Sequence, residues 1–316
     1  MSMRACARTC VQVVIGAGCA VSAALAGAIE ATAQPAGSRA PAAILFNLQE
    51  GDTQEQGLTR AEWNYTFLRG NHARRIFNAA QTRIGTRSNH RKTHLVTWRL
   101  KYGLTESLQP EAEIVYKAFR QHTHADADEH DRNDDGDFER LLLGLSYQAG
   151  RESERLPAVR LRGGILLPRR AETEGIGEET GVDLLVSSSK QVGAARLTAS
   201  MGFAMTFGNH DHPADPIFED RTPISKGFGL RALTYGLGLT HPLSEHWQAN
   251  LELDGKAFDT IELSKRVHEN ELTITPGLVY TTSRGRWETW LGLGFPIGIT
   301  SDTDHLGVSV RTGAHF

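Results

Sequence analysis

The chain has 316 residues, of which 22% are charged, and a formal net charge of −3 at pH 7. This length allows one large all-β domain or two ordinary domains, and the near-neutral charge gives no reason to expect nucleic acid as a partner. The 32 glycines and the scarcity of long apolar runs argue against a helical membrane protein.

Residues 1–33 have the composition of a secretory signal peptide. Arg4 and Arg8 give a positive start, a run of small and apolar residues follows, and residues 31–33 (Ala-Thr-Ala) form a small-x-small cleavage pattern. We therefore expect cleavage after Ala33. An uncleaved membrane anchor is the alternative, because the apolar run is long enough to cross a bilayer. All three cysteines lie in this segment, so the mature chain is expected to have neither disulfides nor thiol catalysis.

Residues 34–57 are rich in Ala, Pro, Gly and Gln and show little periodicity. They are interpreted as a linker or a plug segment, and the short apolar run at 43–46 could pack against another element. From residue 58 to residue 316, strand-like segments of about ten residues recur, the length that a tilted strand needs to cross a bilayer.

Apolar and polar residues alternate along these segments. In the segment at 93–104, for example, Val96, Trp98 and Leu100 oppose Thr97, Arg99 and Lys101. This period-2 pattern predicts strands with one apolar and one polar face. About 12 such segments begin near residues 60, 93, 109, 138, 157, 181, 196, 229, 247, 271, 286 and 306.

The connections between the segments alternate between short and long. The short ones lie near 105–107, 191–193, 241–245 and 283–285. The long ones lie near 70–92, 120–136, 169–180, 208–227, 259–270 and 297–305. Together with aromatic residues near both strand ends, this predicts an all-β fold, a transmembrane antiparallel β-barrel of about 12 strands in the bacterial outer membrane. An exported soluble β-protein is the alternative.

The sequence from Leu306 to Phe316 alternates strictly and puts Phe316 on the apolar parity. In a closed barrel this strand would pair with the first strand and would not be an edge. A final strand of this kind also resembles the assembly signal of bacterial outer-membrane proteins, although a terminal Phe could also be a coincidence.

Three stretches resemble a known family. They are YGLTESLQPEAEIVY (residues 102–116), Gly136-Asp137 followed by FERLLLGLSYQ, and LPAVRLRGGILLP (156–168), and YGLGLTHPLSEHWQANLEL (235–253) repeats the turn of the first. In this order they resemble the outer-membrane protein family named for the meta-pathway of phenol degradation, whose members are described as transporters. The resemblance covers roughly residues 95–316 and implies an outer-membrane barrel. Its motifs are structural and identify no substrate.

If the apolar parity faces lipid, the opposite parity lines the lumen. Burying a charge alone is costly, so a charged lining implies either a wet lumen or a network of paired charges. A 12-stranded barrel should leave a narrow pore, and Arg160 and Arg162 are the predicted constriction residues. Pairing between neighbouring strands is the alternative role of the lining charges. The predicted lumen residues are Arg99, Lys101, Glu111, Glu113, Arg140, Arg160, Arg162, Glu252, Asp254 and Arg311.

One acidic stretch matches half of a calcium-binding loop. Asp131, Asn133 and Asp135, followed by Gly136 and Asp137, fit the start of the pattern D-x-N-x-D-G, but Leu142 stands where the closing Glu belongs. The alternatives are a solvated acidic outer loop or a divalent-cation site, with Ca²⁺ as the single cofactor considered. Two His-x-His pairs, at 122–124 and 210–212, could hold a metal only if their loops met.

The predicted function is passive uptake of small molecules, among them small organic or aromatic solutes, through a narrow charged lumen. The alternatives are a non-conducting structural or binding barrel with acidic, cation-binding outer loops, and an outer-membrane hydrolase. No catalytic residues are predicted, because the sequence has no nucleophile elbow, phosphate loop or HExxH motif. The expected partners are outer-membrane lipid and lipopolysaccharide, the barrel-assembly machinery and a small-molecule solute.

Overall fold

A computed structural model describes residues 45–77, 83–125, 130–167, 180–207, 231–262, 265–284, 287–300, 303 and 306–316. The regular elements of this part of the chain are all β-strands. Among the described residues, no helix is long and apolar enough to cross a membrane. The predicted signal peptide and residues 34–44 of the predicted linker or plug segment lie outside these ranges.

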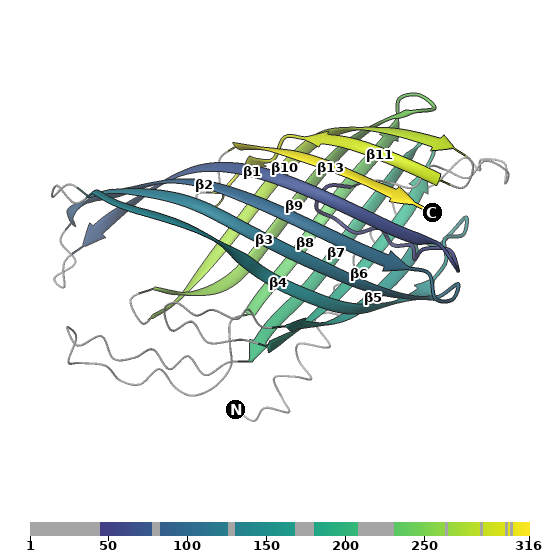
Figure 1. Cartoon of the computed structure of the whole chain (residues 1–316), viewed down its shortest axis with the longest axis horizontal. Coiled ribbons are helices and arrows are strands. Elements are labelled where there is room, and N and C mark those ends of the chain that lie inside the picture. The colour runs from purple at the N-terminus through teal and green to yellow at the C-terminus, as the bar shows by residue number, and fades with distance from the viewer. Residues whose placement is uncertain are drawn as a thin grey trace.

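The strands form one closed antiparallel barrel (Figure 1). Successive strands pair with each other, and the barrel closes because β1 pairs with β13 from Arg60↔His315 to Arg69↔Leu306. The strands are β1 (Thr59–Phe77), β2 (Arg83–Tyr102), β3 (Leu108–Ala125), β4 (His130–Gly150), β5 (Ala158–Leu167), β6 (Thr180–Val192), β7 (Ala195–Phe207), β8 (Arg231–Pro242), β9 (Trp247–Glu262), β10 (Lys265–Arg284), β11 (Trp287–Gly294), β12 (Ile297–Gly298) and β13 (Leu306–His315).

The barrel wall has 12 strands because β11 and β12 are one strand with an interruption at Pro296. Both pair with β10, and β12 continues the register in which Gly277 faces Gly294. At the interruption, the Phe295 amide donates to the Pro276 carbonyl at 2.9 Å. The alignment therefore persists although Pro296 has no N–H to offer. The predicted fold class and strand number are confirmed.

The two faces of the wall differ sharply in polarity. Large apolar side chains cover the outside, and polar and charged side chains line the inside, which is the reverse of a water-soluble protein. Hydrocarbon is the solvent that such an exterior fits. Exposed side chains include Trp98, Leu100, Leu143, Leu145, Leu161, Ile165, Leu237, Leu251, Leu291 and Leu293, and buried ones include Lys101, Gln109, Ser146, Gln148, Arg160, Ser187, Asn250, Glu252 and Arg311.

Aromatic side chains gather on the outside at the end of the barrel that carries the short turns. Trp247 packs against Tyr280 with ring centroids 5.1 Å apart, and Trp287 stacks on Phe316 at 4.9 Å. The backbone of Phe316 extends the closing ladder, because Thr59 and Phe316 exchange two hydrogen bonds of 2.8 and 3.0 Å. Amphipathic rings at this level suit a membrane–water boundary. The role of Phe316 as an assembly signal stays a prediction.

The strands on one side of the barrel are longer than the sequence suggests. Three of the long loops expected from the sequence, near 70–92, 120–136 and 259–270, are largely strand, and β4 reaches 21 residues. Figure 1 shows β1–β4 reaching past β5–β8 at the end opposite the short turns. In these extensions apolar and polar residues do not alternate, because a hairpin beyond the lipid needs backbone pairing but no apolar face. Apolar alternation therefore marks the part of each strand that crosses the bilayer.

We predict that an arginine placed on the outer face at mid-strand will destabilise the barrel. Leu145 on β4 is 50% exposed and pairs with Gly163. Replacing it with Arg should lower the free energy of unfolding in lipid vesicles by about 2–4 kcal/mol. Urea titrations of the barrel in phosphatidylcholine vesicles measure this. Leu156→Arg, in the exposed β4–β5 turn, is the control and should leave the midpoint unchanged. Equal losses for both variants would contradict a hydrocarbon-facing wall.

Candidate functional site

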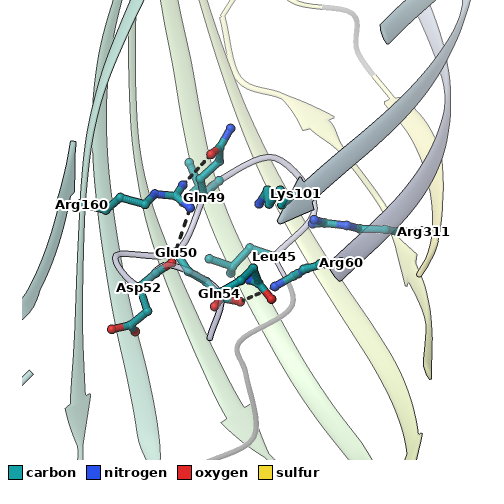
Figure 2. Close-up of a pocket in the computed structure, with 10 residues that line it drawn as sticks. Leu45, Gln49, Glu50, Asp52, Gln54, Arg60, Lys101, Arg160 and Arg311 are labelled. Carbon is teal, nitrogen blue, oxygen red and sulfur yellow. Dashed lines mark hydrogen bonds and ion pairs between the residues drawn. The ribbon is translucent and has the colours of Figure 1, made fainter. Parts of the chain in front are cut away.

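Residues 45–57 run inside the barrel, where wall side chains hold them. Figure 2 shows Arg160 reaching this segment from one wall and Arg60, which pairs with Glu50 at 3.6 Å, from the other side. We call residues 45–57 the luminal segment. Its apolar side chains are almost fully buried, with exposures of 1% for Leu45 and 4% for Phe46. It leads directly into β1, so residue 57 lies at the end of the barrel with the short turns, where the Gly57 amide donates to the Gly103 carbonyl at 2.7 Å.

The inner end of the luminal segment, residues 45–48, is bound by acidic side chains of β9. The carboxylate of Glu252 accepts hydrogen bonds from three consecutive backbone amides, those of Phe46, Asn47 (2.7 Å) and Leu48 (3.1 Å). The Asn47 side-chain amide donates to Asp254 at 2.9 Å. A carboxylate that accepts several amide hydrogens is strongly held, so Glu252 is the main anchor of this end.

The ring of Phe46 lies in a recess floored by glycines. A Cβ built on Gly277, Gly292 or Gly294 would lie 2.3, 3.1 or 3.2 Å from a ring atom of Phe46. Val279 and Trp290, both buried, complete the cluster around the ring. A side chain at Gly277 would collide with the ring, and one at Gly292 or Gly294 would crowd it. These strands are therefore shaped to the occupant of the lumen.

Arginines hold the middle of the luminal segment. Arg160 on β5 donates to the Gln49 side-chain oxygen at 2.5 Å and to the Asp52 carbonyl at 3.5 Å. Arg196 on β7 forms an ion pair with the Asp52 carboxylate. Burial raises the pKa of Asp52 above its ordinary value, although the positive charge of Arg196 acts to lower it.

The outer end of the luminal segment, residues 51–54 toward the short turns, is held by neutral wall side chains. The Gly51 amide donates to Ser189 at 2.7 Å, and the Gln54 amide donates to Gln109 at the same distance. Gln148 accepts from the Thr53 amide at 2.7 Å and donates to the Gly51 carbonyl at 2.9 Å. The backbone of the luminal segment thus finds its hydrogen-bond partners in side chains from β3, β4 and β6.

Glu62 on β1 is the centre of a buried charge network. Its carboxylate pairs with Arg311 (2.8 Å), with Arg99 (3.3 Å) and with Arg60. Arg99 also donates two hydrogen bonds to Glu113, at 2.8 and 2.5 Å. The network links β13, β1, β2 and β3 across the closing seam. Cross-strand pairing, one of the two roles considered for the lining charges, therefore describes this wall.

A second network involves Arg162 on β5. Its guanidinium pairs with Glu111 at 3.3 Å and with Asp183. Between the luminal segment and the walls lies a cavity of about 10 Å³, the size of one water-sized sphere, which Arg60, Lys101, Arg160 and Arg311 help to line. Basic side chains of the wall and residues of the luminal segment therefore share this small cavity.

The predicted lumen residues fall into three groups. Arg160, Glu252 and Asp254 contact the luminal segment, whereas Arg99, Glu111, Glu113, Arg162 and Arg311 belong to the two wall networks. Lys101 is buried beside the cavity. Arg140 has its backbone on β4 opposite Val115, but its side chain lies outside the described residues. Constriction by Arg160 and Arg162 stays a prediction.

The predicted calcium residues lie on a strand and not in a loop. Asp131, Asn133, Asp135 and Asp137 are part of β4 and pair with β3. Their side chains lie outside the described residues, so calcium binding stays a prediction. Within the described part of the chain, no group of three or more His, Cys, Asp and Glu residues could hold a metal ion.

Sequence analysis missed Arg60, Glu62 and Arg196, and it did not assign Phe46 a contact. The first two follow the same parity rule as the lumen residues that were found, because Arg60 and Glu62 alternate with Ala61 and Trp63. Applying the rule to β1 would have revealed them. The contact of Phe46 has no local pattern, because the glycines that receive its ring are more than 200 residues away.

Glu62 offers a direct test of the seam network. Replacing it with Ala would leave Arg60, Arg99 and Arg311 buried without their shared partner, so we expect a loss of about 3–5 kcal/mol in unfolding free energy. Urea unfolding in vesicles measures this loss. Glu106→Ala is the matched control, because Glu106 pairs with Arg151 at 2.6 Å but both side chains are more than 60% exposed. It should cost about 0–1 kcal/mol, and an equally small loss at Glu62 would refute the role of the network.

No protein-family profile and no curated protein matches the sequence, and the resemblance to the phenol-degradation family stays a prediction. Among solved structures, the COG4313 outer membrane channel from Pseudomonas putida F1 is 12% identical, with a TM-score of 0.54 over 85% of this chain and 99% of that chain. The translocator domain of the autotransporter NalP from Neisseria meningitidis is also 12% identical and has a TM-score of 0.45 over 84% of this chain and 90% of that chain. The first likeness shows the fold. With the apolar outer surface, this fold places the chain in the bacterial outer membrane.

Proposed function

We propose that this protein is an outer-membrane channel for the passive uptake of small molecules, and that the luminal segment is its displaceable plug. The observation that carries the proposal is a polar lumen with its own occupant. Hydrogen bonds and ion pairs from wall side chains hold this segment, together with the buried apolar side chains of Leu45, Phe46 and Leu48. A barrel of 12 strands has an interior wider than side chains alone need. The function requires no catalytic residue and no cofactor.

The contacts of the luminal segment suit reversible release. Each neutral hydrogen bond contributes only about 0.5–1.5 kcal/mol net, because water replaces the lost partner. A released segment also regains backbone freedom worth about 1–2 kcal/mol per residue. This freedom opposes both the polar contacts and the burial of Leu45, Phe46 and Leu48. Bound and released states can therefore lie within a few kcal/mol of each other, so that a solute can shift the balance between them.

A non-conducting structural barrel is the second candidate. The observation that favours it is that side chains from several strands hold the luminal segment at many points. In that case the luminal segment would be a permanent part of the core. Recordings of single barrels in planar bilayers separate the two candidates, because a permanent plug gives no conducting steps under any condition.

For assembly, we propose the barrel-assembly machinery and lipopolysaccharide as partners. The supports are the outer-membrane barrel fold and the position of Phe316, which is 42% exposed beside Trp287 at the short-turn end.

Gly51 provides the sharpest test of the plug. A Cβ at this position would lie 2.5 Å from the Ser189 amide and 2.9 Å from the Ala158 carbonyl, both rigid backbone atoms. Gly51→Ala should therefore expel this part of the segment and raise the open fraction of single barrels roughly 5–30-fold, the equivalent of losing one or two kcal/mol of contacts. Planar-bilayer recording measures this fraction.

Gln56→Ala is the control for the same recording. Gln56 is exposed in the same segment, so its replacement should leave the open fraction unchanged. If Gly51→Ala barrels fold normally and conduct no more than the control, the luminal segment is not the plug of a channel.

The two predicted constriction residues should behave differently. Arg160 contacts the luminal segment, whereas Arg162 pairs with the wall residues Glu111 and Asp183. Arg160→Ala should raise the open fraction, and Arg162→Ala should shift the ion selectivity of the open pore toward cations, because it leaves two carboxylates without their partner. Reversal potentials in a salt gradient measure selectivity. Identical behaviour of the two variants would contradict these separate roles.

A further inference from the structure

The part of the lumen that holds Leu45–Leu48 is built like a ligand site. Its acidic side is Glu252 on β9, which pairs in register with Thr275 on β10. Two residues further along β10 is Gly277, which faces Gly294 on β11. A fully buried carboxylate and a ring-sized recess thus lie side by side on three adjacent strands.

The carboxylate of Glu252 accepts its hydrogen bonds from the luminal segment. Among the described residues, the donors to its carboxylate are the amides of Phe46, Asn47 and Leu48. An ionised carboxylate is a pure acceptor. When the segment leaves, Glu252 therefore loses its donors, and Asp254 loses the Asn47 amide. Two acidic side chains are then open to another donor group.

The recess beside Glu252 is occupied by the aromatic ring of Phe46. Gly277, Gly292 and Gly294 form its floor, and each would collide with or crowd the Phe46 ring if it carried a Cβ. Val279 and Trp290 form its apolar sides. When Phe46 leaves, the apolar surface of the recess is exposed to water, which is unfavourable in free energy. Another apolar group that replaces the ring removes this penalty.

We propose that the luminal segment occupies a solute-binding site, and that this site takes small organic cations that carry an ammonium group next to an aromatic ring. The inference rests on the proposed function, because the segment must leave for a solute to enter. An ammonium group offers three N–H donors, as many as the segment presents to Glu252. The ring of the solute then replaces that of Phe46 between Gly277 and Gly294.

Benzylammonium is the probe, and isothermal titration calorimetry on the detergent-folded full chain is the measurement. Methylammonium has the charge without the ring, benzyl alcohol has the ring without the charge, and benzoate has the opposite charge. We expect benzylammonium to bind at least tenfold more tightly than each of the three. Binding should also be tighter to Gly51→Ala than to the unmodified chain, because the released state is more populated.

Two substitutions test the two halves of the site. Glu252→Gln keeps the size and the acceptor oxygen but removes the charge, so it should weaken benzylammonium binding at least tenfold. Benzyl alcohol should bind at least as tightly as to the unmodified chain, because the variant also loosens the luminal segment. Gly294→Val should abolish binding of both ring compounds. Glu245→Gln, in the exposed β8–β9 turn, is the control and should change nothing.

The outcomes are decisive in both directions. Equal affinities for benzylammonium and methylammonium, or an unchanged affinity in a normally folded Glu252→Gln variant, overturn the proposed site. If Gly294→Val does not fold, Gly292→Ala gives a smaller intrusion into the same recess and should still weaken ring binding. A barrel that conducts but binds the four probes equally would support the proposed channel and contradict the proposed binding site. A barrel that binds benzylammonium through Glu252 but never conducts would support the proposed binding site and contradict the proposed channel.

Discussion

Matching of buried polar groups is the constraint on which this structure depends. A wall that turns its apolar parity toward hydrocarbon must turn the other parity inward, and charges placed there need water or a partner. The protein meets this demand by sharing: one carboxylate, Glu62, serves three arginines across the closing seam. The same network joins the first strand to the last, so charge matching and barrel closure support each other.

The luminal segment also needs partners for its buried polar groups. A chain segment inside a barrel brings unpaired backbone amides and carbonyls, which would be costly to bury alone. Wall side chains supply the partners: Glu252 at the inner end, and Ser189, Gln148 and Gln109 at the outer end. Because these contacts are polar, water or a polar solute can substitute for them. The apolar contacts of Leu45, Phe46 and Leu48 are lost on release unless an apolar group of a solute replaces them.

Much of the barrel could be predicted from the sequence because its signal is local. Strand alternation has a period of two residues, so the outward positions of Trp98 and Leu145 follow from their immediate neighbours. The same rule fails where both faces are wet. The outer parts of β3 and β4, including Asp131 to Asp137, are polar on both parities and resemble a loop, yet they pair as strands.

The sequence by itself determined the period-2 faces, the short turns and hence the kind of wall, because each depends on residues close together in the chain. The tertiary structure decided what fills the lumen. Phe46 meets Gly277 and Gly294, and Glu252 binds amides at residues 46–48, only because barrel closure brings distant strands around one axis. No periodicity within residues 45–57 encodes those contacts, since the partners are defined by register and curvature across the whole barrel.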